Sequence, residues 1–315
     1  MCCSSILLIR LHESPHNYLS MINLNFKATL AAFSLAAVCV SCCCGDSCSE
    51  SSGGCCGDAK SAAALLPVGA ADNVSLQDYD LVWQDEFDAP RGLPNAEEWY
   101  YETGDHGWGN KEIQNYVPGI LGADTCAIVD DGKLTITLKP VGDEILSVRM
   151  NTLKAWQYGY FEGRLKIPHG KGTWPAFWMM PKESSYGWPA CGEIDIMEHV
   201  GYDPDVIHCT IHCESFNHKI GTQVARQDTV PNTGTEYHVY AVEWTPDFIR
   251  GFVDGKQYYE FLNDKKGENA SWPFDNAFYL KLNLAWGGWG GREGLDPTVL
   301  PAKYEIDYVR VFAKP

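Results

Sequence analysis

The chain has 315 residues, of which 45% are hydrophobic and 21% charged, and its formal net charge is -17. The length suits one large all-β domain, and the composition is that of a globular protein, which excludes a disordered chain and a membrane bundle. The negative charge repels phosphate backbones and anionic lipids, so nucleic acid is excluded as a partner and heavily sulfated polysaccharides are disfavoured as substrates.

Residues 1–41 are predicted to be an upstream segment followed by a signal peptide. Lys27 precedes an apolar run over residues 28–40, which is too short to span a bilayer and ends at Ser41 and Cys42. Ser41-Cys42 resembles the processing site of bacterial lipoproteins, although Cys39 stands where an aliphatic residue is usual. We therefore expect an exported protein, either a cell-surface lipoprotein anchored to the membrane through Cys42 or, alternatively, a plainly secreted one.

Residues 42–77 are predicted to be a low-complexity linker, because Gly, Ser, Cys and Ala dominate their composition. The cysteine clusters there lack the histidines and the regular spacing of a metal site, which favours the linker interpretation. Nine of the 13 cysteines lie at or before Cys56. The other four are predicted to be small buried residues rather than a disulfide framework: Cys126, Cys191, Cys209 and Cys213.

Residues 78–315 have the pattern of a folded all-β domain. Short runs such as KLTITLKP, YHVYAVEWT and FYLKLNLAW are rich in β-branched and aromatic residues, and Gly, Pro and Asp separate them. Many short strands in one domain predict a β-sandwich or a barrel. All eleven tryptophans lie after residue 80. Those beside Gly or Pro, such as Trp108, Trp174 and Trp188, are placed to stack on sugar rings, whereas Trp83 and Trp244 are expected in the core.

The segment GEIDIME places three carboxylates close together. On an unbroken strand Glu193 and Asp195 share a face, whereas Glu198 points to the other face. A β-bulge at Ile196 and Met197 would return Glu198 to the face of the other two acids. Clustered carboxylates raise at least one pKa, which a general acid requires near neutral pH. A solvated acidic edge or a metal site is disfavoured, because apolar residues interleave with the acids and metal ligands would lie closer together.

With its neighbours, this segment reads WPACGEIDIMEHVG and resembles the signature of glycoside hydrolase family 16, in its laminarinase-like branch. VWQDEFD, WGNKEIQNY, YGYFEGRLKIP, GTWPAFWMMP and IDYVRVF stand in the family order, so the resemblance extends from about Leu81 to Phe312. It implies a jelly-roll β-sandwich of two antiparallel sheets with a concave substrate cleft. It also implies a retaining double displacement that requires no cofactor, in a monomeric enzyme.

The resemblance also implies the roles of individual residues. Glu193 matches the nucleophile, Glu198 the acid/base, and Asp195 the residue that holds the charge and orientation of the nucleophile. Arg149 and Gln157 are weaker candidates for sugar binding. The stronger candidates are Asn110, Glu112, Trp174, Trp178, Trp188 and His212, together with Trp286 in NLAWGGWGG, which is expected to add a stacking surface.

The sequence contains two candidate metal sites. His208 and His212 do not form a zinc pair, because four residues on a strand separate their side chains by roughly 13 Å at about 3.3 Å per residue. The resemblance implies a structural calcium ion held by Glu86, the carbonyl of Gly132 and Asp307, and oxygen ligands of this kind suit calcium.

The resemblance therefore implies an endo-β-1,3-glucanase that also cuts mixed β-1,3-1,4-glucan. The extra residue Met197 places the chain outside the lichenase branch. Agarases and carrageenases share the longer motif, so a galactan is the alternative substrate. A non-catalytic glucan-binding module is the alternative function, and the presence of all three acids disfavours it.

Overall fold

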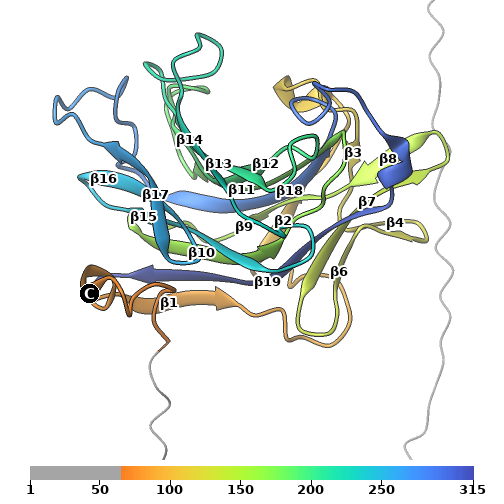
Figure 1. Ribbon diagram of the computed structural model, residues 1–315, viewed down its shortest axis with the longest axis horizontal. Helices are drawn as coiled ribbons and strands as arrows, with labels where there is room; N and C mark the ends of the chain where they lie inside the picture. Colours follow the sequence, from red (N-terminus) through yellow and green to blue (C-terminus); the bar gives the residue numbers. More distant parts are fainter. Residues whose placement is uncertain (1–64) are drawn as a thin grey trace, which may run out of the picture. The chain divides into compact units, whose positions relative to one another are not determined.

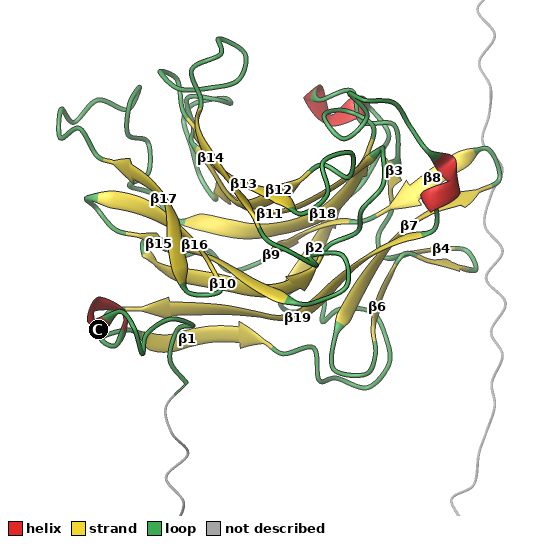
Figure 2. Ribbon diagram, in the orientation of Figure 1, coloured by secondary structure: helices red, strands yellow, loops and turns green. Residues whose placement is uncertain are grey.

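The computed structural model describes residues 65–315, which fold into two facing antiparallel β-sheets (Figures 1 and 2). Within these residues the larger sheet has ten strands, with the order β17-β16-β15-β10-β19-β7-β8-β3, and β1 and β6 pair with β19 and β7. The smaller sheet has seven strands, in the order β14-β13-β12-β11-β18-β9-β2. Apart from the parallel pair β3–β8, the strand pairs are antiparallel, which confirms the predicted sandwich.

The strands of the larger sheet are β1 (Asp80–Asp85), β3 (Asn115–Tyr116), β6 (Ala127–Val129), β7 (Leu134–Val141), β8 (Glu144–Ser147), β10 (Gly159–Lys166), β15 (His238–Trp244), β16 (Phe248–Val253), β17 (Lys256–Leu262) and β19 (Ala302–Ala313). Those of the smaller sheet are β2 (Trp99–Glu102), β9 (Arg149–Thr152), β11 (Thr173–Pro181), β12 (Glu193–His199), β13 (Val206–His212), β14 (Val224–Thr229) and β18 (Phe278–Trp286). A separate hairpin joins β4 (Ile120–Leu121) to β5 (Asp124–Thr125), and the 3-10 turns are η1 (Val74–Leu76), η2 (Gly107–Gly109) and η3 (Pro297–Val299).

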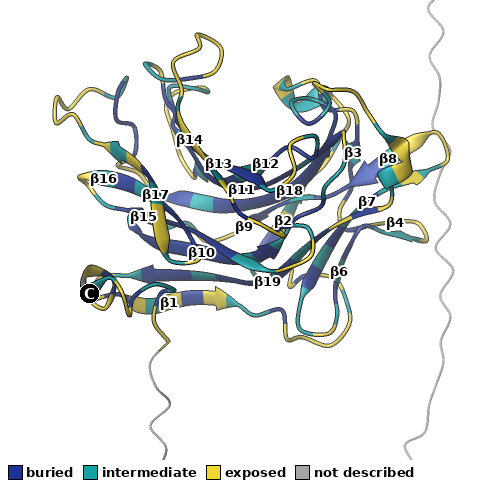
Figure 3. Cartoon of the chain, in the orientation of Figure 1, coloured by how far each residue is buried: buried dark blue, intermediate teal, exposed yellow. Residues whose placement is uncertain are grey.

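The core lies between the two sheets, where Figure 3 shows buried strands facing each other. In β18 every second residue enters it, since Phe278, Leu280 and Leu282 are fully buried members of the main apolar cluster. Alternation along a strand then directs the intervening residues, including Lys281 and Asn283, to the outer face of the smaller sheet. This curved outer face carries the predicted site.

Other core predictions are also confirmed. Trp83 and Trp244 belong to the buried cluster. The four cysteines at Cys126, Cys191 and beyond are buried and free, as expected of small apolar residues rather than disulfide partners.

The folded domain begins earlier than the predicted boundary at residue 78. Leu76 has no exposed surface and packs with Ala70 against Tyr160 on the outer face of the larger sheet. The backbone N–H of Val68 donates a hydrogen bond to Glu162, and the Tyr160 hydroxyl donates one to the Val68 carbonyl. Residues 67–77 therefore form a docked segment rather than a linker. The few apolar side chains of this stretch form no regular pattern in the sequence, but they pack on the outer face of the larger sheet.

The predictions for residues 1–41 and for the linker up to residue 64 lie outside the described residues. Among residues 65–315, no helix has the length and apolar character that a membrane crossing would require.

Candidate active site

Strand β12, which carries the three predicted acids, contains the predicted bulge. Asp195 lies opposite Thr210 of β13 and Glu198 opposite His208, so the two residues between the acids face a single residue of the partner strand. The pairing of β12 with β11 shifts at the same place. Because the extra residue restores the parity, Glu193, Asp195 and Glu198 all lie on the outer face of the smaller sheet. The residues between the acids are fully buried in the core.

Each of the two glutamates accepts a hydrogen bond from a tryptophan. The indole Nε1 of Trp188 donates to Glu193 at 3.1 Å, and that of Trp174 donates to Glu198 at 3.1 Å. Trp188 comes from the loop before β12, and Trp174 from the neighbouring strand β11. An N–H donated to an ionised carboxylate orients it and stabilises its charge. The structure therefore brings both predicted tryptophans to the predicted acids.

His212, predicted as a sugar-binding residue, lies beside Asp195 and Glu193. Its Nε2 is 3.5 Å from Asp195 Oδ2 and 3.7 Å from Glu193 Oε1. Both distances exceed that of an ordinary hydrogen bond. His208 lies nearer the start of β13, and its ring centroid is 4.8 Å from that of Trp289.

Burial raises the pKa of all three acids, and repulsion from neighbouring carboxylates adds to the shifts of Glu193 and Asp195. Burial, with the charge of Glu198, raises the pKa of Glu193, and burial raises that of Glu198 to about 7. Asp195 is only 3% exposed, and its burial together with both glutamates raises its pKa well above the usual value. Burial lowers the pKa of His212 to about 4, so the imidazole is neutral at pH 7. The cluster therefore retains protons at neutral pH, as a general acid requires.

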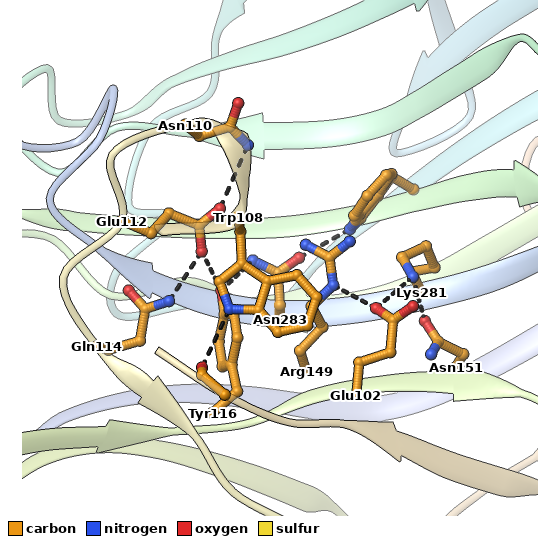
Figure 4. A network of polar contacts seen from close by, with 12 residues as sticks. Glu102, Trp108, Asn110, Glu112, Gln114, Tyr116, Arg149, Asn151, Lys281 and Asn283 are labelled. Atoms are coloured by element: carbon orange, nitrogen blue, oxygen red, sulfur yellow. Dashed lines mark hydrogen bonds and ion pairs between the residues drawn. The ribbon is translucent and has the colours of Figure 1, made fainter. Parts of the chain in front are cut away.

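Glu112 lies in a buried hydrogen-bond network at one side of the site (Figure 4). It is 6% exposed, and its carboxylate accepts hydrogen bonds from Asn110 at 3.3 Å, Gln114 at 2.8 Å and Tyr116 at 2.8 Å. The network continues through the hydroxyl of Tyr116, which accepts a hydrogen bond from Asn283. Glu112 thus holds the loop that presents Asn110, and of these two predicted sugar-binding residues Asn110 is the more exposed.

A second set of polar side chains surrounds Trp178 on the outer face of the smaller sheet. Trp178 Nε1 donates to Asn283 at 2.7 Å, which joins Trp178 to the network of Glu112. The Arg149 guanidinium lies 4.5 Å from the centre of the Trp108 ring and 4.8 Å from that of Trp178. Its ion pair with Glu102 is visible in Figure 4.

Glu102 also pairs with the ammonium of Lys281 at 2.8 Å, and burial lowers the pKa of that lysine to about 7. Glu102, Lys281 and Asn283 were not predicted from the sequence. The alternation in FYLKLNLAW was the available signal, because it places Lys281 and Asn283 on the face away from the core.

The prediction for Trp286 is wrong. Trp286 is 3% exposed and packs on Gly172, where an added Cβ would lie 2.5 Å from the indole ring. It occupies an inward position of β18, so its ring belongs to the core. The aromatic ring at the site is instead Trp289, three residues on, which is half-buried and has its centroid 5.9 Å from that of Trp174.

Gln157 lies at an exposed position and donates a hydrogen bond to the carbonyl of Asp275, and no described contact joins it to the three acids. The predicted calcium ligands also have other partners. Glu86 accepts hydrogen bonds from Arg310 at 2.7 and 2.9 Å, and Asp307 accepts one from Arg164 at 2.6 Å. These contacts do not fit a calcium ion bound by Glu86, Gly132 and Asp307, because guanidinium groups already neutralise both acids.

A family model described as "Glycosyl hydrolases family 16" matches residues 114–310. The chain belongs to glycoside hydrolase family 16. The beta-glucanase of Rhodothermus marinus is 47% identical over 247 residues, which cover 74% of this chain and 85% of that protein. The family assignment predicted from the sequence is thereby confirmed.

Solved structures of the family agree with the fold. The X-ray structure of the laminarinase from Rhodothermus marinus has a TM-score of 0.71 at 46% identity, covering 74% of this chain and 97% of that one. A mutant of SCLam, a non-specific endo-β-1,3(4)-glucanase of family 16, has a TM-score of 0.72 at 42% identity, covering 80% of this chain and 97% of that one. That second structure presents a 1,3-β-D-cellobiosyl-glucose at its active site. The predicted jelly-roll sandwich is therefore confirmed.

Proposed function

We propose that this family 16 glycoside hydrolase is an endo-β-1,3(4)-glucanase that acts by a retaining double displacement. The observation that carries the proposal is the bulged strand β12, which places Glu193, Asp195 and Glu198 on one face with a tryptophan N–H on each glutamate. The relatives named above as a beta-glucanase, a laminarinase and an endo-β-1,3(4)-glucanase support the choice of substrate.

In the first step, an oxygen of Glu193 attacks the anomeric carbon and the bond from that carbon to the glycosidic oxygen breaks. Glu198 gives its proton to the departing oxygen, for which a pKa of about 7 is well suited. In the second step, Glu198 takes a proton from water, and the resulting nucleophile displaces Glu193 with a second inversion. The net result is retention of configuration, as in other enzymes that use two carboxylates in this way.

Asp195 acts on Glu193 through its proton. Burial beside the two glutamates raises its pKa well above the usual value, which favours a protonated carboxyl group that can donate to Glu193 as the negative charge returns there. Trp188 supplies a second donor to the same carboxylate. Both donors favour the ionised nucleophile over the protonated one.

The aromatic residues on the same face suit an extended sugar chain. Trp174, Trp178, Trp188 and Trp289 are all partly exposed there, and a flat ring can cover the apolar face of a pyranose. Arg149 offers a cationic donor beside the rings of Trp108 and Trp178. Several binding positions in a row are what an enzyme that cuts within a polymer requires.

The activity test uses the purified protein and its Glu193→Ser variant with laminarin, lichenan, agarose and carrageenan, and counts new reducing ends. We expect the wild type to cut laminarin and lichenan and the variant to cut neither. Cleavage of a galactan alone would keep the chemistry and replace the substrate. Tight binding without cleavage of any glycan would make the protein a binding module, and an inverted anomer in the first product by NMR would refute the retaining route.

We also propose that the enzyme is exported and held at the cell surface through a lipid on Cys42, as a monomer. The motif that ends the apolar segment before Cys42 supports this proposal. A mass spectrum of the mature N-terminus distinguishes an acylated cysteine from plain secretion.

A further inference from the structure

One histidine and two carboxylates converge on a single point of the active site. Ligand atoms of Glu193, Asp195 and His212 all lie within 4.8 Å of one another. The side chains come from two neighbouring strands, since Glu193 of β12 is the register partner of His212 of β13. The adjacency is therefore built into the pairing of the two strands rather than into a flexible loop.

The spacing of these atoms matches that of ligands around a small metal ion. Zinc binds His nitrogen and carboxylate oxygen at roughly 2.0–2.1 Å in tetrahedral geometry, which places neighbouring ligand atoms about 3.3 Å apart. His212 Nε2 lies 3.5 Å from Asp195 Oδ2 and 3.7 Å from Glu193 Oε1. Two edges of the tetrahedron therefore need to shorten by only a few tenths of an ångström.

An unpaired polar atom provides an independent indication. Asp195 Oδ2 has no hydrogen-bond partner among the described residues, and the residue is only 3% exposed. Unpaired buried polar atoms are costly, and a cation that binds both Asp195 and Glu193 would remove their repulsion as well. Imidazole nitrogen and carboxylate oxygen both bind zinc, whereas calcium and magnesium prefer oxygen ligands alone.

We propose that Glu193, Asp195 and His212 bind a divalent transition-metal ion of the zinc type, and that the bound ion inhibits hydrolysis. The ion occupies the lone pairs of the Glu193 carboxylate and so prevents attack on the anomeric carbon. Binding depends on the geometry of the three side chains and releases the protons that the acids hold at neutral pH, whereas the inhibitory effect rests on the proposed function of Glu193. In most metal-bound histidines the second ring nitrogen donates a hydrogen bond to a protein group, which strengthens metal binding. His212 Nδ1 has no such partner among the described residues, which favours weak and reversible binding.

The first experiment measures inhibition of laminarin hydrolysis by zinc in metal-free buffer. We expect inhibition that EDTA reverses and that added laminarin relieves. In His212→Gln the inhibition constant should rise at least tenfold when measured on the residual activity. His208→Gln is the matched control, because His208 lies on the same strand and face but outside the cluster, and its inhibition constant should stay within twofold of the wild type. An unchanged constant in His212→Gln would overturn the proposal.

The second experiment measures binding without activity, on the full chain. Calorimetric titration with zinc should show one site fewer in His212→Gln than in the wild type. The cysteines before residue 57 are the same in both proteins, so zinc bound to them does not affect this difference. Crystals of the wild type soaked in zinc should show an anomalous peak at bonding distance from His212 Nε2. No peak there at saturating zinc would overturn the proposal whatever the variants do. A peak there in a protein that cuts no glucan would refute the proposed function and leave the metal site standing.

Discussion

The two tryptophan hydrogen bonds provide a direct test of which glutamate has which role. Trp188→Phe removes the N–H donated to Glu193, and Trp174→Phe removes the one donated to Glu198, while each variant keeps a flat apolar ring. A carboxylate that loses a donor is less stable in its ionised form, so its pKa rises. The nucleophile must be ionised and the acid must be protonated. The pKa of Glu193, about 8, lies above that of Glu198, about 7, so Glu193 governs the basic limb of the pH profile and Glu198 the acidic limb. Trp188→Phe should therefore move the basic limb to higher pH, and Trp174→Phe the acidic limb.

The size of each shift follows from the strength of the lost bond. A hydrogen bond to a charged group contributes about 1.5–3 kcal/mol, and a bond to the neutral acid roughly half of that. The difference between the two protonation states is then about 0.8–1.5 kcal/mol, which corresponds to a pKa shift of roughly half a unit to one unit. Shifts of this size are measurable in the limbs of kcat/KM.

The assay is kcat/KM on a soluble glucan between pH 4 and pH 9 for the wild type and both variants. Trp178→Phe is the matched control, because the N–H of Trp178 donates to Asn283 and not to an acid, and neither limb should move. If both active-site variants move the same limb, or if the limbs are exchanged, the assignment of nucleophile and acid is wrong.

Four further predictions concern stability and binding. Glu193→Gln should abolish hydrolysis and raise the melting temperature at pH 8. The fold raises the pKa of Glu193 to about 8, so ionisation of this carboxyl group destabilises the folded state as the pH rises above its usual pKa. At pH 4 the group is protonated in both the folded and the unfolded state, and the gain should vanish. Equal melting at pH 8 would contradict this. Trp286→Ala should lose about 3–5 kcal/mol of stability on unfolding in urea, whereas Trp289→Ala should raise KM and leave stability nearly unchanged. Leu76→Ala should cost about 2–5 kcal/mol; a loss below 0.5 kcal/mol would show that the docked segment contributes little. EGTA should leave the melting temperature unchanged, and a drop that calcium reverses would restore the predicted calcium site.

Several features of the protein follow from the sequence alone. Alternation of apolar and polar residues predicts the strands, because side chains point to opposite faces at every second position. The same parity, applied to Glu193, Asp195 and Glu198, requires the bulge that the structure contains. Parity also places Trp286 on the inner face of β18 with the leucines, which is incompatible with a stacking surface at this residue.

Other features depend on contacts between distant parts of the chain. Arg310 neutralises Glu86 across 224 residues, and Lys281 pairs with Glu102 across 179 residues. The local sequence around either acid gives no indication of which basic residue it contacts. The docking of residues 67–77 likewise needed the outer face of the larger sheet. Strand order and register decide such contacts, and they result from the packing of the whole sandwich, whereas alternation and motif spacing act over a few residues. The acids could therefore be identified from the sequence, but their partners, including His212 beside Asp195, were decided by the tertiary structure.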